Sequence, residues 1–196
     1  MTHKVLCIIG TRPEAIKMAP VIKALQAEGN INCRVLATAQ HRGMLDQVLE
    51  FFGITPDIDL DIMRPNQSLT TLTARLLLDL DGVLQSEKPD VVLAQGDTTT
   101  VMSAALACFY LRIPFGHIEA GLRTGDMHNP FPEEANRVIA GRLARWHFAP
   151  TQGSMDNLLR EGVAQADITM TGNTVIDALL MTDRKSTRLN SSHPLD

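Results

Sequence analysis

Acidic and basic side chains follow three apolar, strand-like runs of the sequence. Asp97 comes directly after VVLAQG, and Glu119 comes directly after PFGHI. The first run, VLCIIG, is followed by the cations Arg12 and Lys17. Because parallel α/β sheets place their sites at the carboxyl ends of strands, we expect these side chains to lie at one edge of a sheet. The pattern predicts a site that binds an anion and carries out acid/base chemistry.

The turn GTRPE, after the first run, combines several signals of a helix start. Thr11 and Glu14 have the spacing of a capping box, and Pro13 suits the first turn of a helix. Free N–H groups at this helix start, with Arg12 and Lys17, would hold a phosphate well. An ordinary helix cap with solvated cations is an equally good interpretation. The turn lacks the GxGxxG pattern of dinucleotide-binding proteins.

The acids at the next two strand ends differ in how easily a structural explanation accounts for them. Asp97 would also serve as the N-cap of the helix that follows it. Neither a cap nor a helix dipole calls for an acid at Glu119, which makes it the stronger candidate. His117 lies one residue inside the strand end, and we interpret it as a buried residue that supports the site.

A further pair of acids, Glu133 and Glu134, follows Pro132 at the start of a predicted helix. Acids in the first turn interact favourably with the helix dipole, and this is the structural alternative to a catalytic function. Glu134 also lies three residues before Arg137. We interpret these two as a surface ion pair of small energetic value.

Strand-like and helix-like segments alternate along most of the chain. This βαβα order predicts an α/β fold, with a Rossmann-like parallel sheet covered by helices on both faces. Strands are expected at 5–9, 34–39, 91–94, 115–118, 147–149 and 168–171. Helices are expected at 14–26, 43–52, 69–86, 99–111, 133–144, 155–161 and 175–181.

Length and composition indicate one large soluble domain. The chain has 196 residues, and 44% of them are hydrophobic and 20% charged. A net charge of −4 argues against nucleic acid or an anionic membrane as partner. No apolar run approaches the length of a membrane span or of a secretory leader, which favours a cytoplasmic location.

Six blocks in order along the chain together resemble the non-hydrolysing UDP-N-acetylglucosamine 2-epimerases. The resemblance extends over nearly everything from Lys4 to Thr182. The blocks are GTRPEAIKMAP, TAQHRGMLDQVL, GDTTT, HIEAGLRTGD, PEEANR and GNTVIDAL.

The resemblance implies a two-domain, GT-B-like enzyme whose active site lies between two Rossmann-like halves. This chain is similar to the N-terminal half only. We therefore expect an N-terminal domain at residues 1–173 and the start of a crossover to a second domain at 174–183. Residues 184–196 are expected to be a non-native polar tail, into which the helix at 175–181 should fray.

By the same resemblance, Asp97, Glu119 and Glu133 match the acid/base carboxylates of the family. Arg12 and Lys17 match its nucleotide-sugar contacts, and Asp97 and Glu119 are also expected to bind substrate.

Another block bears on regulation. Gln40 matches part of the allosteric substrate site of bacterial members. Gly43 and Asn66 stand where some members carry Gln and Arg, so this chain departs from the pattern of that site.

The implied reaction interconverts UDP-N-acetylglucosamine and UDP-N-acetylmannosamine. UDP leaves C1, a proton leaves C2, and both return to 2-acetamidoglucal with inversion at C2. No hydride moves, so no cofactor is expected. The family also implies a homodimer for the full-length protein. This half alone is expected to show no epimerase activity, because it supplies only one wall of the cleft. A non-catalytic nucleotide-sugar-binding half and a GT-B glycosyltransferase domain are the alternatives.

Overall fold

The computed structural model describes residues 2–38, 42–62, 64 and 66–191. Within this part of the chain, seven parallel strands form one sheet in the order β3-β2-β1-β4-β5-β6-β7. The strands are β1 (His3–Ile9), β2 (Ile31–Ala37), β3 (Ile58–Asp59), β4 (Val91–Gln95), β5 (Phe115–Ile118), β6 (Trp146–Ala149) and β7 (Ile168–Met170). The α/β class and the parallel sheet predicted from the sequence are confirmed.

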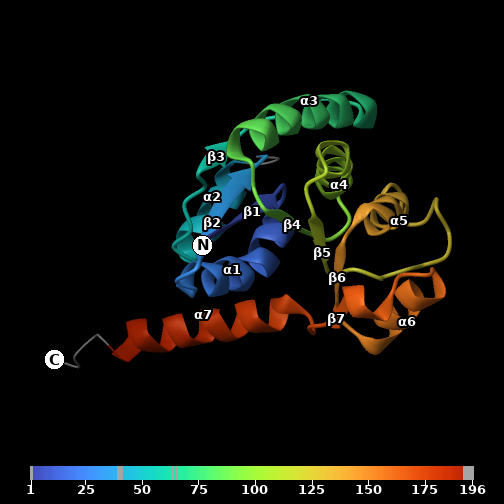
Figure 1. Ribbon diagram of the computed structural model, residues 1–196. Coiled ribbons are helices and arrows are strands. Elements are labelled where there is room, and N and C mark those ends of the chain that lie inside the picture. The colour runs from blue at the N-terminus through green and yellow to red at the C-terminus, as the bar shows by residue number, and fades with distance from the viewer. Residues whose placement is uncertain (1, 39–41, 63, 65, 192–196) are drawn as a thin grey trace.

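Helices cover both faces of the sheet (Figure 1). Among the described residues they are α1 (Arg12–Ala27), α2 (Arg42–Phe51), α3 (Leu69–Glu87), α4 (Thr99–Leu111), α5 (Glu133–Leu143), α6 (Gln152–Arg160) and α7 (Thr174–Ser191), with a short 3-10 turn, η1 (Gln165–Asp167). In Figure 1, α3, α4 and α5 lie above the sheet, whereas α1, α6 and α7 lie below it. None of the described helices is long and apolar enough to cross a membrane.

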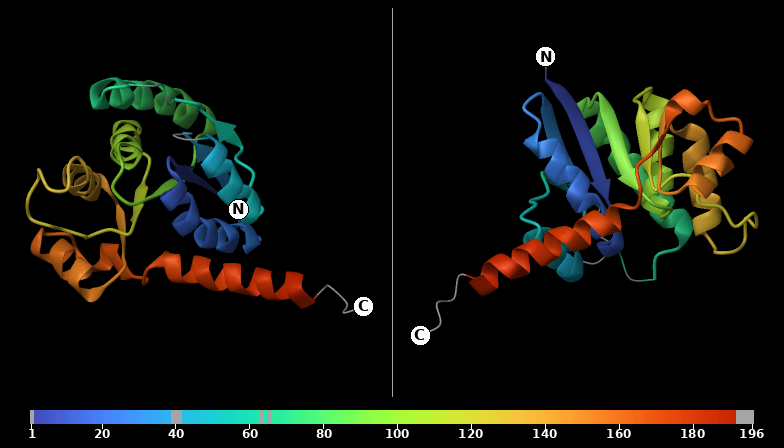
Figure 2. Two further views of the ribbon diagram at one scale, coloured as in Figure 1. Left: turned by 180° about the vertical axis from the view of Figure 1, so that it is seen from behind. Right: turned by 90° about the horizontal axis from the view of Figure 1, so that it is seen from below.

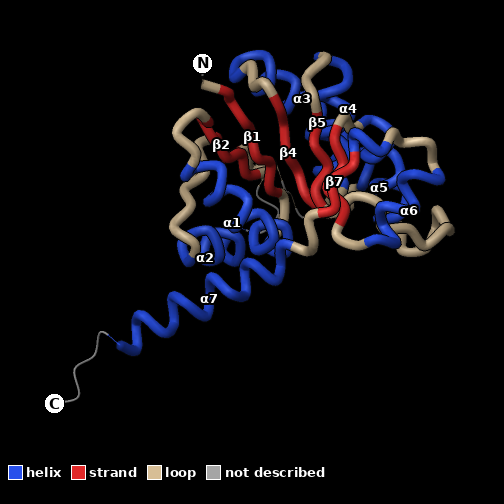
Figure 3. Tube along the Cα trace, turned by 60° about the horizontal axis from the view of Figure 1, so that its bottom comes forward, coloured by secondary structure: helices blue, strands red, loops and turns tan. Residues whose placement is uncertain are grey.

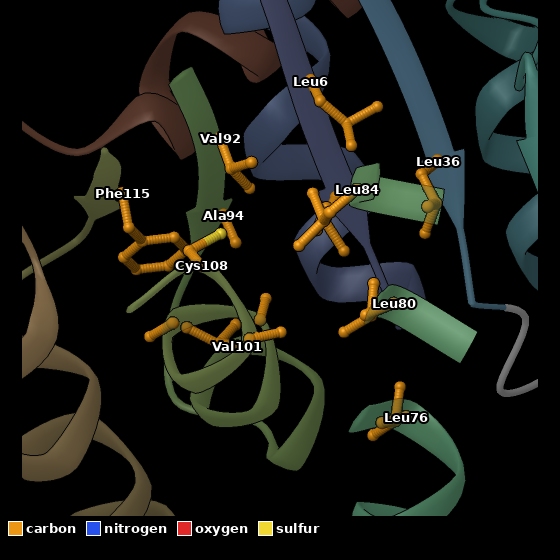
Figure 4. Packing of buried hydrophobic residues seen from close by; sticks show 14 of the residues in the cluster. Leu6, Leu36, Leu76, Leu80, Leu84, Val92, Ala94, Val101, Cys108 and Phe115 are labelled. Carbon is orange, nitrogen blue, oxygen red and sulfur yellow. The ribbon is translucent and has the colours of Figure 1, made fainter. Parts of the chain in front are cut away.

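One face of the sheet packs against α3 and α4. Helix α3 buries a leucine at every fourth position, which places one apolar stripe against the strands. Figure 4 shows Leu76, Leu80 and Leu84 in one cluster with Val92 and Phe115 of the sheet and Val101 of α4. The buried leucines of the stripe are Leu72, Leu76, Leu80 and Leu84.

The opposite face packs against α1 and α2. Met18 and Ile22 of α1 and Leu45 of α2 are buried against β1 and β2 in a second cluster. Helix α6 closes the far end of this face with Leu158. Helix α7 runs along α1 and extends past the sheet, as both views in Figure 2 show.

The order of the strands reverses direction between β1 and β4. From β1 the chain builds the sheet outward through β2 and β3, and from β4 it builds in the opposite direction. Such a reversal leaves a crevice at the carboxyl ends of the two central strands, which is where ligands bind in open α/β sheets. The turns that follow β1 and β4 therefore define the place to look for a site.

Three features differ from the sequence prediction. Strand β3 was missed because only Ile58 and Asp59 pair with β2, too few to form an apolar pattern. The turn η1 carries no apolar pattern either. The prediction that the last helix frays after Met181 is wrong, because α7 continues to Ser191. No Gly or Pro interrupts this stretch.

The loop after β5 contains two glycines, one packed against α6 and the other in open space. Gly121 and Gly125 have φ of +86° and +83°, in the left-handed region that side chains rarely adopt. A Cβ on Gly121 would lie 2.2 Å from the carbonyl oxygen of Ser154 in α6. A Cβ on Gly125 would meet nothing within 4 Å.

We expect Gly121→Ala to destabilise the protein more than Gly125→Ala. Both substitutions carry the strain of a left-handed alanine, about 1–2 kcal/mol. Only Gly121→Ala adds a clash with the backbone of α6, which should cost about a further 1–3 kcal/mol. Urea unfolding of the 196-residue chain measures both losses. Equal losses would show that the loop moves away from α6 without cost.

Candidate active site

A hollow of about 440 Å³ lies at the carboxyl ends of β1, β4 and β5. These strands run side by side, and their loops gather at one edge of the sheet (Figure 3). Most of the side chains around the hollow are polar or charged. It is lined by Thr11, Pro13, Glu14, Lys17, Gln95, Gly96, Asp97, Thr98, Glu119 and Leu122.

Glu119 is held by a cation and an amide at the end of β5. Lys17 Nζ donates to both carboxylate oxygens, at 2.7 and 2.8 Å, and Gln95 Nε2 donates to Oε2. The side chain of Glu119 is only 12% exposed. Its φ is +64°, a conformation that strains a non-glycine residue and that gathers at functional sites.

Asp97 follows β4 but does not cap the next helix. The N-cap of α4 is Thr98, whose hydroxyl accepts from the backbone N–H of Val101. The cap interpretation of Asp97 is therefore wrong. Its Oδ2 instead lies 3.2 Å from Nη2 of Arg137. Burial raises the pKa of Asp97 above its ordinary value, and Arg137 acts in the opposite direction.

Glu14 joins the two loops at the crevice. The capping box predicted for Thr11 and Glu14 is confirmed. The carboxylate is buried and accepts from the backbone N–H groups of Gly10 and Thr11, at 2.5 and 2.8 Å. It also accepts from the Thr98 hydroxyl at 2.6 Å. Burial raises its pKa, and these hydrogen bonds oppose the rise. Sequence spacing revealed the cap but not the contact with Thr98.

Helix α5 brings three polar side chains to the site from its first turns. Glu134 Oε1 accepts from the backbone N–H groups of Thr124 and Gly125, both at 3.0 Å. Glu134 Oε2 lies 3.3 Å from Nε of Arg137. The predicted ion pair with Arg137 is therefore present, but it is buried and not on the surface, because the side chain of Glu134 is 2% exposed. Asn136, also buried, donates to the carbonyl oxygen of Asp97. The sequence EEANR gives no sign of this burial, because its polar residues follow no apolar pattern.

His117 is a buried supporting residue, as the sequence analysis predicted. Its Nε2 lies 2.7 Å from the carbonyl oxygen of Gly96. Burial lowers its pKa to about 4. The ring is therefore neutral at physiological pH, and the Nε2 tautomer donates to this carbonyl.

Three of the residues predicted for the site line the hollow, and two others lie outside its lining. Asp97, Glu119 and Lys17 come together at the hollow. Glu133 begins α5 outside the lining, yet its charge acts on Asp97. Arg12 is exposed at the start of α1, with Nη1 3.7 Å from Sδ of Met44.

Gln40, predicted for an allosteric site, lies outside the described residues. The described part of the chain holds no group of three or more His, Cys, Asp or Glu residues arranged to bind a metal ion.

The geometry combines half-buried carboxylates with cations and the N-terminus of a helix. The carboxylates can transfer protons, and Lys17 with the start of α1 can stabilise an anion. Together with the switch-point crevice, these features define an α/β domain with a candidate site for acid/base chemistry on an anionic ligand.

The chain belongs to the UDP-N-acetylglucosamine 2-epimerase family, whose model matches residues 23–195. The UDP-N-acetylglucosamine 2-epimerase of Yersinia pestis is 62% identical over 176 residues, and that of Escherichia coli K12 is 60% identical over 177. Each alignment covers 90% of this chain but only 47% of the relative. The chain thus spans about half the length of the curated relatives it matches.

Solved structures agree with this assignment. The crystal structure of a UDP-GlcNAc 2-epimerase from Neisseria meningitidis bound to UDP-GlcNAc superposes with a TM-score of 0.90 at 56% identity. It is matched over 93% of this chain and 50% of its own. The lipopolysaccharide outer core galactosyltransferase WaaB matches with a TM-score of 0.63 at 16% identity, over 87% of this chain and 45% of its own, which shows a common fold alone. This chain is the N-terminal Rossmann-like half of a GT-B-like fold.

We expect the free energy of unfolding of Glu14→Gln, taken relative to that of the parent chain, to increase as the pH rises. The folded-state pKa of Glu14 is raised above its ordinary value of 4.5. The stability contributed by the protonated carboxyl is therefore complete below the unfolded pKa and is lost as the pH rises through the folded pKa. Glutamine does not ionise and escapes this loss.

The measurement is the free energy of unfolding of both proteins between about pH 4 and 8, across the window set by the raised pKa. Glu28→Gln, at the exposed end of α1, is the control for loss of an unburied glutamate. A difference between Glu14→Gln and the parent that stays constant with pH would contradict the expectation.

Proposed function

We propose that this chain supplies the acid-bearing half of an enzyme that interconverts UDP-N-acetylglucosamine and UDP-N-acetylmannosamine. The observation that carries the proposal is the meeting of Asp97, Glu119 and Lys17 at the switch-point crevice. Membership of the epimerase family supports it.

The first step breaks two bonds of the substrate. The C1–oxygen bond breaks, and its electron pair leaves with UDP. The ring then gains cationic character, which makes the proton on C2 acidic enough for a carboxylate to remove. The C2–H electron pair forms the C1=C2 double bond of 2-acetamidoglucal. Burial raises the pKa of Asp97 above its ordinary value, which makes its carboxylate a stronger base for this step.

The second step reverses the first on the other face of C2. A carboxylic acid delivers a proton to C2, and the UDP oxygen adds again to C1. Two faces require acids on different elements: Glu119 lies in the turn after β5, and Glu133 begins α5. We assign acid/base catalysis to Asp97, Glu119 and Glu133, of which Asp97 and Glu119 also contact the sugar.

The departing UDP needs positive charge. Lys17 and Arg12 both belong to α1, and its N-terminus faces the crevice through Thr11 and Pro13. We propose that Arg12 and Lys17 bind the nucleotide sugar with the help of this helix dipole. Gln40 belongs to the proposed allosteric site for a second substrate molecule.

One half of a GT-B-like cleft leaves the nucleotide sugar solvated on its other side. Each charge contact then acts at high dielectric and contributes little. We propose residues 1–173 as the N-terminal domain and residues 174–183, the first part of α7, as the start of the crossover to a second one. The chain alone should be inactive.

Two further properties of the full-length protein are proposed. A homodimer is supported by large apolar side chains exposed on α3 and α4: Leu78 is 75% exposed, Phe109 59% and Tyr110 68%. The molar mass of the full-length protein in solution tests whether it is a dimer. Because nucleotide sugars are charged and do not cross bilayers unaided, we place the enzyme in the cytoplasm where they are made.

The experiment uses a completed enzyme, in which this sequence is continued by the second half of a relative such as the Escherichia coli protein. NMR follows the conversion of UDP-N-acetylglucosamine to UDP-N-acetylmannosamine. Conversion by the completed enzyme and none by the 196-residue chain is the expected result. UDP-sugar binding without conversion would favour a non-catalytic half. Transfer of sugar to an acceptor would favour a glycosyltransferase.

In the completed enzyme, Asp97→Asn and Glu119→Gln should each lower kcat by about 10²-fold or more. Each substitution keeps the shape of the side chain and removes its basicity. Asp156→Asn, an acid-to-amide change on the exposed surface of α6, is the matched control and should leave kcat unchanged. Near-normal turnover of both site variants would remove these residues from catalysis.

A further inference from the structure

Side chains from helix α5 and strand β5 converge on Asp97. Asn136 Nδ2 donates to the Asp97 carbonyl oxygen at 2.9 Å, and His117 Nε2 lies 2.7 Å from the carbonyl oxygen of Gly96. Arg137 Nη2 lies 3.2 Å from the Asp97 carboxylate. The peptide before Asp97, its own carbonyl and its side chain are thus each held by a different group.

Arg137 is the best enclosed of the cations beside Asp97. Its side chain is 11% exposed, against 31% for Asp97 and 26% for Lys17. A guanidinium in such surroundings is screened little by water, so its charge acts strongly on its neighbours. Its Nη2 forms an ion pair with Asp97, and its Nε lies 3.3 Å from Glu134 Oε2 while donating to the carbonyl oxygen of Glu133.

The remaining charges around Asp97 are mostly negative. Glu119, at the end of β5, and Glu133, in the first turn of α5, both disfavour its ionised form. Glu14, on α1, is a further carboxylate close enough for Asp97 to act on it. Lys17 of α1 favours the ionised form less than Arg137 does. Removing Arg137 would therefore leave Asp97 among like charges.

Arg137 also connects Asp97 to the loop after β5. Its second partner, Glu134, accepts from the backbone N–H groups of Thr124 and Gly125. This loop begins directly after Glu119, so one arginine fixes the relation between two of the proposed catalytic strand ends.

We propose, building on the epimerase function, that Arg137 is a positioning residue that keeps the Asp97 carboxylate charged and directed into the crevice, with Asn136 fixing the backbone beneath it. Arg137 does not line the hollow. It acts on the reaction through Asp97.

The test is the pH dependence of kcat/KM in the completed enzyme, because this profile reports the ionisations of the free enzyme. Arg137→Gln keeps a polar side chain and removes the charge. This substitution should shift the acidic limb of the profile upward by about one pH unit. The reason is that a nearby opposite charge lowers the pKa of a carboxyl group by about one unit or more. Arg137→Lys keeps the positive charge but lacks the planar guanidinium group. Its acidic limb should therefore lie close to that of the parent enzyme.

Arg142→Gln is the matched control on the same helix, since its guanidinium donates to the Glu161 carbonyl oxygen, away from Asp97. It should leave the limb in place. Asn136→Ala removes a neutral hydrogen bond and should lower kcat about 10-fold without moving the limb. If Arg137→Gln does not fold, the kcat of Asn136→Ala still tests whether α5 positions Asp97.

An acidic limb that stays in place in Arg137→Gln would overturn the proposal, as would a kcat unchanged in Asn136→Ala. These failures are distinct from failure of the epimerase function, in which the completed enzyme with its parent sequence would already lack conversion.

Discussion

The site depends on keeping several carboxylates close together while they remain charged. Two like charges 4 Å apart repel by about 4 kcal/mol at the effective dielectric near a protein surface. That cost is comparable with the entire stability of a small domain. Lys17 bound to Glu119 and Arg137 bound to Asp97 offset it. The cations are thus part of what allows acid/base groups to gather at one sheet edge.

The fold brings these charges together without long connections. Each carboxylate or cation lies within a few residues of a strand end or a helix start, and the parallel sheet aligns those ends at one edge. Glu14 ties the loop after β1 to the loop after β4. Glu134 ties α5 to the loop after β5. The strained backbone of Glu119 is sustained because neighbouring elements hold its side chain.

Local pattern predicted the elements well and the contacts between them less well. Asp97, Glu119 and Lys17 were found because each is close in sequence to an apolar run that ends abruptly. The contacts that Glu14 makes with Thr98 and Arg137 makes with Asp97 were not predicted, because in each case the partner belongs to another element tens of residues away. Burial decides whether such a pair is a weak surface contact or a strong one, and spacing does not reveal burial.

The most direct test of the account is the fate of the hydrogen on C2. Elimination breaks the C2–H bond, and re-addition forms a new one with a proton from solvent. The completed enzyme, incubated with UDP-N-acetylglucosamine in D2O, should therefore yield UDP-N-acetylmannosamine that carries deuterium at C2. Epimerised product that retains the original hydrogen at C2 would contradict the proposed chemistry of these carboxylates.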